Sequence, residues 1–281
     1  MDDLITSPAN PRLKLIRRLR ERKVREQHGL FYVEGIRLVA EAIQQDWPIE
    51  MLVVAPHRLS SAFAWQHVEQ ARRKGIRILE VSPQAFESLA LKENPQGIAV
   101  VACQRWAPLS MVNPNAGELW VALEAIQDPG NLGTILRTAE AVGAKGVILL
   151  EHTTDPYDPV AVRASMGAVF TQQLVRTTQD EFLHWCAQTH PPLIGTSDKA
   201  RQDYHEFSYP QGLILMMGSE REGLSPVYAA LCQTMVAIPM VGRVDSLNVA
   251  VATAVVLYEI FNQRRRRENR TRMGVSEEQL S

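Results

Sequence analysis

Asn131 and Arg137 follow an apolar run, residues 119–123, at a place where polar side chains could do chemistry. A Pro129–Gly130 turn ends that run, and Asn131 is of a type that caps helices. Arg137 comes nearly two helical turns later and so lies beside Asn131. A guanidinium is a permanent cation that suits an anionic ligand, and ligands of open α/β sheets bind at the carboxyl ends of strands. The alternative is a surface arginine on an ordinary Asn-capped helix.

A second apolar run, residues 213–217, leads into a polar turn bounded by Gly218 and Gly223. Glycines in such a turn let backbone amides approach a ligand closely. The turn is not Gly-x-Gly-x-x-Gly, and it lacks the Lys-Ser/Thr pair of a P-loop, which disfavours a dinucleotide or a triphosphate. The alternative is a plain strand-to-helix connection with glycine chosen for its dihedral angles.

A third segment ends a strand at Pro239 and begins a helix at Ser246, with a polar loop between them. Ala250, Ala252 and Ala254 make that helix thin, so that backbone can pack closely against it. As a bare pattern this is typical of a capped core helix.

In order and spacing, the three segments resemble the motifs of the SpoU/TrmH branch of the SPOUT RNA methyltransferases. Asn131, Gly133 and Arg137 match Asn-x-Gly-x-x-x-Arg, and Gly218, Glu220 and Gly223 match Gly-x-Glu-x-x-Gly. Ile-Pro-Met at 238–240 precedes Ser-Leu-Asn-Val-Ala at 246–250. At the front, residues 7–11 and 31–35 are similar to the substrate-binding domain, often L30e-like, that precedes the catalytic domain in this family.

The resemblance implies an α/β fold: a C-terminal SPOUT domain with a parallel sheet and a deep trefoil knot, preceded by a smaller L30e-like α/β domain. It implies a homodimer with the active site near the interface, to which the long last helix would contribute. The implied cofactor is S-adenosyl-L-methionine, bent in the knot and held largely by backbone atoms. The residues expected to bind it are Thr196, Met217, Gly218, Ile238, Pro239, Met240 and Leu247.

The implied reaction moves the sulfonium methyl group to a ribose 2′-hydroxyl by in-line displacement. Arg137 is the family's central catalytic residue and is sometimes assigned as the base. A guanidinium stays protonated, so holding the phosphate and stabilising charge at the attacking oxygen suits it better. The residues expected to orient Arg137, the ribose and the cofactor are Asn131, Glu220, Ser246 and Asn248; Glu220 is alternatively structural, tying the second motif to the first.

Basic residues gather near both ends of a chain whose formal net charge is only −1. Residues 12–25 hold eight basic residues and one acid, and residues 264–272 hold six arginines and one glutamate. Residues 26–263 are acidic, with sixteen basic and twenty-five acidic residues. Basic arms on an acidic body indicate binding to phosphate backbones, whereas each arm alone could be a solvated helix face or a frayed tail. The expected RNA-binding residues are Arg12, Lys14, Arg17, Arg18, Arg20, Arg22, Lys23 and Arg25.

Hydrophobic periodicity divides the chain into four parts. Residues 1–105 are expected to form an α/β RNA-binding domain that begins with one amphipathic helix over 12–27. Residues 106–117, rich in Pro and Asn, are expected as a linker. Residues 118–263 alternate strands and helices, which predicts a parallel sheet covered on both faces and includes a strand over 169–175 and a last helix over 246–266. Residues 264–281 are expected as a basic, flexible tail.

Several classes of protein are disfavoured by composition. Three scattered cysteines argue against a disulfide framework and suit a cytoplasmic protein, and no Cys or His spacing fits a metal site. The most apolar run, residues 249–261, is too short to cross a membrane.

The substrate is expected to be ribosomal RNA rather than transfer RNA, because the front domain resembles that of the rRNA enzymes. The alternatives are a tRNA 2′-O-methyltransferase and a non-catalytic RNA-binding or ribosome-assembly protein on the same fold. The presence of Asn131, Arg137 and Asn248 disfavours a non-catalytic protein. The nucleotide and the role of the tail stay open.

Overall fold

The computed structural model describes residues 4–91, 93–219, 221–243 and 246–273, which form two compact units. The described residues up to Arg105 form the first unit together with Asp155–Thr171. The second unit contains Trp106–Thr154 and the described residues from Gln172 onward. The boundary expected after residue 105 therefore divides the structure, but residues 155–171 pack with the first unit rather than with the second.

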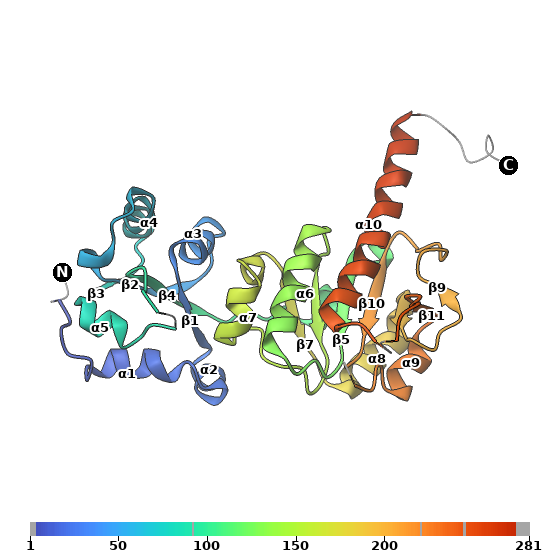
Figure 1. Cartoon of the computed structure of the whole chain (residues 1–281), viewed down its shortest axis with the longest axis horizontal. Helices are drawn as coiled ribbons and strands as arrows, with labels where there is room; N and C mark the ends of the chain where they lie inside the picture. Colours follow the sequence, from blue (N-terminus) through green and yellow to red (C-terminus); the bar gives the residue numbers. More distant parts are fainter. Residues whose placement is uncertain (1–3, 92, 220, 244–245, 274–281) are drawn as a thin grey trace. The chain divides into compact units, whose positions relative to one another are not determined.

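The first unit is built on a mixed sheet of four strands in the order β1-β4-β2-β3 (Figure 1). Strands β2 and β3 run parallel, and the other neighbouring pairs are antiparallel. Its strands are β1 (Leu30–Glu34), β2 (Ile49–Val54), β3 (Ile78–Glu80) and β4 (Ile98–Cys103). Its helices are α1 (Pro11–Arg18), α2 (Arg22–His28), α3 (Ile36–Gln44), η1 (Pro56–Arg58), α4 (Ala62–Arg73), α5 (Pro83–Glu87), α7 (Pro159–Ala164) and η4 (Ala168–Phe170).

The single helix expected over residues 12–27 is two helices, α1 and α2, in the structure. Asn10 caps α1 by accepting from the backbone N–H of Arg12, and Pro11 takes the first helical position, where its missing N–H costs nothing. The carbonyls of Leu19 and Arg20, in the turn between the helices, accept hydrogen bonds from the Arg25 guanidinium at 2.9 and 2.7 Å. A side chain that satisfies these carbonyls allows the helix to break here.

Residues 155–171 join the first unit through a buried ion pair and an aromatic cluster. Arg25 Nε donates to Asp155 Oδ2 at 2.7 Å, and both side chains are buried. The Tyr157 ring lies 4.6 Å from that of Phe31, and Phe170 packs edge-on against Trp47 at 5.3 Å between ring centroids. These contacts explain why a segment from the middle of the chain belongs to the N-terminal unit.

The second unit is a seven-stranded sheet in the order β7-β6-β5-β10-β8-β11-β9, in which every neighbouring pair is parallel. Its strands are β5 (Leu119–Leu123), β6 (Gly146–Leu149), β7 (Gln173–Arg176), β8 (Leu193–Thr196), β9 (Gln202–Asp203), β10 (Leu213–Met217) and β11 (Thr234–Ala237). Its helices are η2 (Leu109–Met111), η3 (Pro114–Ala116), α6 (Pro129–Ala141), α8 (Gln179–Thr189), α9 (Pro226–Leu231) and α10 (Val249–Met273).

Two late strands insert between earlier ones in this sheet. Strand β10 lies between β5 and β8, and β11 lies between β8 and β9. Because all are parallel, the segments that follow β5, β8, β10 and β11 emerge at one edge. Helices α6 and α10, which follow two of these strands, pack side by side (Figure 1). On one face of the sheet, Phe182 of α8 and Tyr228 of α9 pack against Trp120, Ile214 and Met216.

Three expected elements in the second half of the chain differ from the structure. The strand expected over 169–175 is the short helix η4 followed by β7, because residues 168–170 turn within the first unit. The edge strand β9 was not expected from the sequence. Helix α10 begins at Val249 rather than Ser246 and continues to Met273, so the expected tail is helical up to that residue. Residues 274–281 lie outside the described residues.

Within the described ranges, every helix is too short or too polar to cross a membrane.

Candidate active site

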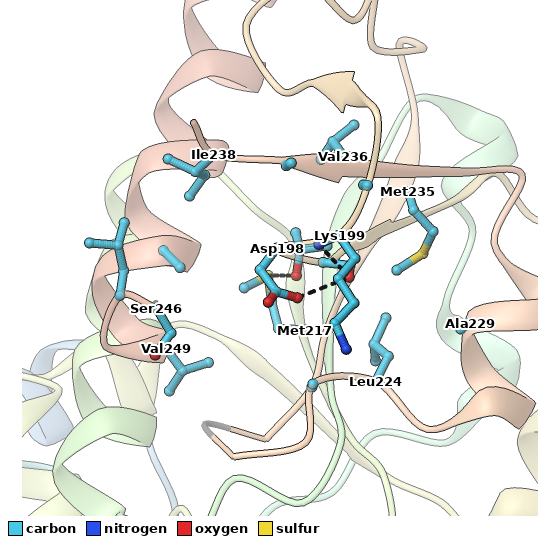
Figure 2. Close-up of a pocket in the computed structure, with 18 of the residues that line it drawn as sticks. Asp198, Lys199, Met217, Leu224, Ala229, Met235, Val236, Ile238, Ser246 and Val249 are labelled. Carbon is cyan, nitrogen blue, oxygen red and sulfur yellow. Dashed lines mark hydrogen bonds between the residues drawn. The ribbon is translucent and has the colours of Figure 1, made fainter. Parts of the chain in front are cut away.

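A pocket of about 930 Å³ lies where strands β8, β10 and β11 end (Figure 2). The loops after these strands and the start of α10 form its walls. All seven residues expected to bind the cofactor line this pocket: Thr196, Met217, Gly218, Ile238, Pro239, Met240 and Leu247. The structure therefore brings together residues that are far apart in the sequence, and it does so through the inserted strands β10 and β11.

The turn after β10 closes tightly on itself. The backbone N–H groups of Ser219 and Gly223 each donate to the other residue's carbonyl, at 3.1 and 3.0 Å. A Cβ atom on Gly218 would lie 2.0 Å from the carbonyl carbon of Gly223, which no side chain tolerates. Gly223 has φ +70°, a left-handed conformation that glycine adopts without strain. The spacing of these two glycines therefore follows from the shape of the pocket wall.

The lining of the pocket fits a nucleoside that carries a charged tail. Met217, Leu224, Ile238 and Val249 give it apolar surface, as a purine ring requires. The backbone N–H and carbonyl groups of Ile238 and Met240 form no hydrogen bond within the described part of the chain. They are thus available to the polar edge of a ring.

Asn131 and Asn248 meet across helices α6 and α10. The Nδ2 of Asn248 donates to Oδ1 of Asn131 at 3.0 Å. The Oδ1 of Asn248 accepts from the backbone N–H groups of Ala250 and Val251, at 2.9 and 3.3 Å, and so caps α10. One amide side chain therefore starts the last helix and holds the first motif to the third.

Asn131 does not cap helix α6, contrary to the expectation. Asp128 caps it, since its carboxylate accepts from the backbone N–H of Asn131 at 2.7 Å, and Pro129 takes the first helical position. The capping residue thus lies three residues earlier than expected, and the Asn131 side chain, which does not cap the helix, accepts from Asn248.

Arg137 lies on α6, six residues after Asn131, and is exposed. Its guanidinium makes no hydrogen bond or ion pair with any residue that the structure describes. A cation without a protein partner is available to an anionic ligand. Ser246 lines the pocket and is exposed. Glu220 lies outside the described residues.

Glu124 is a further residue of the site that the sequence analysis missed. It directly follows β5, and its carboxylate accepts from the backbone N–H of Ser225 at 2.8 Å. Ser225 comes just after the β10 turn and precedes α9. Glu124 therefore ties the end of β5 to the segment between the second motif and α9. An acid directly after an apolar strand was the signal that could have identified it.

The thiols of the second unit are unsuited to nucleophilic catalysis. Burial raises the pKa of Cys186 to about 12. Burial, and secondarily the neighbouring Cys186, raises the pKa of Cys232 to about 12 as well. Both thiols stay protonated at neutral pH, and the thiolate is the nucleophilic form. Among the described residues, no cluster of three His, Cys, Asp or Glu side chains could hold a metal ion.

The expected RNA-binding residues differ in how far they are free to bind. Arg25 does not fit that role, because it is only 1% exposed and its guanidinium is used by Asp155, Asp158 and two backbone carbonyls. Arg17 donates to Ser88 Oγ and the carbonyl of Pro8, and Arg20 donates to the carbonyls of Leu89 and Ala90. Arg20 is exposed nonetheless, as are Arg12, Lys14, Arg18, Arg22 and Lys23. Of these, Arg22 pairs with Glu26 at 3.1 Å and Arg18 with Glu21 at 3.8 Å.

The profile of the SpoU rRNA Methylase family matches residues 118–258, and that of the MRM3-like substrate binding domain matches residues 10–100. The chain is 33% identical over 253 residues to a 23S rRNA (uridine(2479)-2′-O)-methyltransferase of Streptomyces viridochromogenes, covering 88% of this chain and 87% of the relative. It is 28% identical to the 23S rRNA (guanosine(2553)-2′-O)-methyltransferase RlmP of Bacillus subtilis strain 168, over 91% of this chain and 98% of that relative.

Among solved structures, the AdoMet-bound rRNA methyltransferase from Sinorhizobium meliloti matches with a TM-score of 0.84 and 36% identity, over 92% of this chain and 97% of that one. The parallel seven-stranded sheet is thus that of the SPOUT methyltransferases, and the trefoil knot expected from the motifs follows from this fold. The chain belongs to the SpoU rRNA methylase family, as its three motifs and its fold together require.

Proposed function

We propose that this chain transfers a methyl group from S-adenosylmethionine to a ribose 2′-hydroxyl of ribosomal RNA of the large subunit. The observation that carries the proposal is the pocket, where all seven expected cofactor residues meet beside the Asn131–Asn248 contact. The relatives that cover nearly the whole chain are named as 23S rRNA 2′-O-methyltransferases, which supports rRNA over tRNA. One acts on a uridine and the other on a guanosine, so the relatives favour no base.

Each residue of the proposed site has a distinct task. The bound S-adenosylmethionine supplies an electrophilic methyl group. Backbone atoms of Gly218, Ile238 and Leu247 hold the cofactor, and Met217 and Pro239 exclude water from its apolar part. Arg137 binds a phosphate of the RNA and stabilises negative charge on the attacking oxygen. A guanidinium remains protonated, so the proton of the hydroxyl goes to another acceptor.

A homodimer is part of this proposal. Helix α10 exposes Val251 and Tyr258, which are 50% and 46% exposed and lie seven residues apart on one face. Leu247 and Met240, each 36% exposed, are further exposed apolar side chains of this unit, and both line the pocket. A second copy of the chain would cover that face of α10. Tyr258→Glu is expected to reduce the molar mass measured by light scattering by half, whereas a parent of monomeric mass would contradict the homodimer.

The first unit is proposed to bind the RNA through the exposed basic residues of α1 and α2. Replacing Lys14, Arg18 and Lys23 by alanine is expected to weaken RNA binding. It is also expected to reduce the slope of log affinity against log salt concentration by about 2, because each lost phosphate contact lowers that slope by ~0.7–0.9. The matched control replaces Arg37, Arg73 and Arg77, which are exposed elsewhere on the unit. An equal slope change in both triple variants would show that only net charge matters.

The test of the function is methyl transfer from labelled S-adenosylmethionine to unmodified total RNA, followed by size fractionation and alkaline digestion. Label in large rRNA that survives as an alkali-resistant dinucleotide is the expected result, because a 2′-O-methyl group blocks cleavage. Label in the tRNA fraction would keep the chemistry and overturn the substrate. Cofactor binding without transfer to any RNA, including ribosomal particles, would favour a non-catalytic RNA-binding or assembly protein.

The proposed compartment is the cytoplasm, where rRNA is found and where the three free thiols would stay reduced.

A further inference from the structure

The loop after β8 places two oppositely charged side chains in the pocket, and nothing described so far uses them. Asp198 and Lys199 follow Thr196 and Ser197, and all four residues line the pocket. We propose that this pair recognises the amino-acid end of the cofactor, with the Lys199 ammonium binding its carboxylate and the Asp198 carboxylate binding its α-ammonium. The inference rests on the proposed function, because it takes S-adenosylmethionine as the ligand.

The loop is held in place by hydrogen bonds that leave the Lys199 ammonium and one oxygen of the Asp198 carboxylate without a partner among the described residues. The backbone N–H of Ser197 donates to the carbonyl of Val236 at 3.0 Å, which ties the loop to β11. The Ser197 hydroxyl accepts from the backbone N–H of Lys199 at 3.2 Å and donates to Asp198 Oδ1 at 3.4 Å. A short turn thus presents both side chains to the same space.

Lys199 extends into the pocket in Figure 2, and its nitrogen ends on the side of Met217 and Leu224. The Nζ atom makes no hydrogen bond or ion pair with the described residues. Asp198 lies next to it, with its carboxylate also directed into the pocket (Figure 2). Two such groups, side by side and opposite in sign, are complementary to a zwitterion.

Charge decides which part of the ligand Lys199 can accept. S-adenosylmethionine carries a sulfonium, an ammonium and one carboxylate at neutral pH. An ammonium in the pocket repels the first two groups and attracts only the carboxylate. Four other charged residues line the pocket: Arg201 and Asp203 further along the same segment, and Arg221 and Glu222, a second adjacent pair, on the turn after β10. The Asp198–Lys199 pair is the one whose two residues are both hydrogen-bonded to the Ser197 hydroxyl.

A phosphate of the RNA is the other anion that Lys199 could meet. A phosphate fits the loop less well, because the Asp198 carboxylate beside the lysine would repel it. A phosphate also carries no cationic group that could pair with Asp198. In the cofactor, both charges of the loop find a partner. The amino-acid end is therefore the occupant that the loop favours.

The experiment measures binding of three ligands by isothermal titration calorimetry to the full chain. The ligands are S-adenosylmethionine, its decarboxylated form, and 5′-methylthioadenosine, which lacks the whole amino-acid end. Lys199→Met is expected to weaken the binding of S-adenosylmethionine about tenfold, the effect of losing one charge-assisted hydrogen bond. The affinities of the other two ligands are expected not to fall. Asp198→Asn is expected to weaken the binding of S-adenosylmethionine and of its decarboxylated form, but not the binding of methylthioadenosine.

Two control variants make the outcomes decisive. Lys199→Arg keeps the positive charge and should retain most of the affinity. Lys145→Met removes one exposed lysine of the same unit outside the pocket and should change none of the affinities. Equal weakening of all three ligands by Lys199→Met would overturn the proposal in favour of a general disturbance of the pocket. Unchanged S-adenosylmethionine affinity, with a reduced salt slope of RNA binding, would assign Lys199 to the RNA. A parent chain that binds none of the ligands would instead contradict the proposed function.

Discussion

Arg137→Ala is expected to lower the turnover number by at least about a hundredfold and to leave S-adenosylmethionine affinity within about twofold of the parent value. The guanidinium is exposed on α6 and has no partner among the described residues, so none of their contacts depends on it. Its loss removes a donor that acts on the charge developing at the attacking oxygen. The measurement is single-turnover methyl transfer with saturating cofactor, beside calorimetric cofactor binding.

Arg137→Lys separates charge from geometry in the same assay. Lysine keeps the positive charge but cannot donate two parallel hydrogen bonds to a phosphate. A rate between those of the parent and Arg137→Ala is expected, with an unchanged melting temperature for both variants. Turnover near the parent value in Arg137→Ala would remove this residue from the mechanism.

Strands β5, β6, β8, β10 and β11 of the second unit could be predicted because each is a short, mostly apolar run, whereas the polar edge strand β9 could not. Buried parallel strands are apolar on both faces, which makes runs such as 119–123 and 213–217 recognisable. Their order in the sheet could not be predicted. The insertion of β10 between β5 and β8 depends on contacts between residues far apart in sequence, and no local pattern encodes them.

Local sequence rules did not determine which residues cap α6 and α10. Asp128 and Asn131 are both good capping residues, and Pro129 at the first helical position decides for Asp128. Ser246 and Asn248 offer the same ambiguity, and Asn248 makes the capping bonds. In each case the amide lies within reach of its counterpart on the other helix, and that contact is tertiary.

Counting charges identified the basic segment over residues 12–25 but could not say which side chains reach solvent. Arg25 occupies the same helix as the exposed Lys23, two residues away, yet it is buried. Its acidic partners come from residues 155–158, more than a hundred residues later in the chain. Nothing in the sequence pattern of residues 159–164 indicated that helix α7 packs against β1.

Arg25→Ala is expected to destabilise the first unit by about 3–5 kcal/mol, the cost of leaving one member of a buried ion pair without its partner. The change would leave the buried carboxylate of Asp155 without its ion-pair partner and would remove the donor to the carbonyls of Leu19 and Arg20. Hydrogen exchange of the β1 and β4 amides measures the effect, because unfolding of a two-unit chain need not be a single transition. Lys23→Ala, on the exposed side of α2, is the matched control and should change stability by less than about 0.5 kcal/mol.

Arg25→Met with Asp155→Leu should recover part of the loss, because replacing both members of a buried pair by apolar groups removes the unpaired charge. This recovery distinguishes an ion pair that holds residues 155–171 in the first unit from a general intolerance of α2 to substitution. If Arg25→Ala instead left hydrogen exchange unchanged and weakened RNA binding, as is expected of the triple variant at Lys14, Arg18 and Lys23, Arg25 would return to the RNA-binding surface. The segment between β6 and β7 would then be held to the first unit by its remaining contacts, among them the packing of Tyr157 on Phe31 and of Phe170 on Trp47.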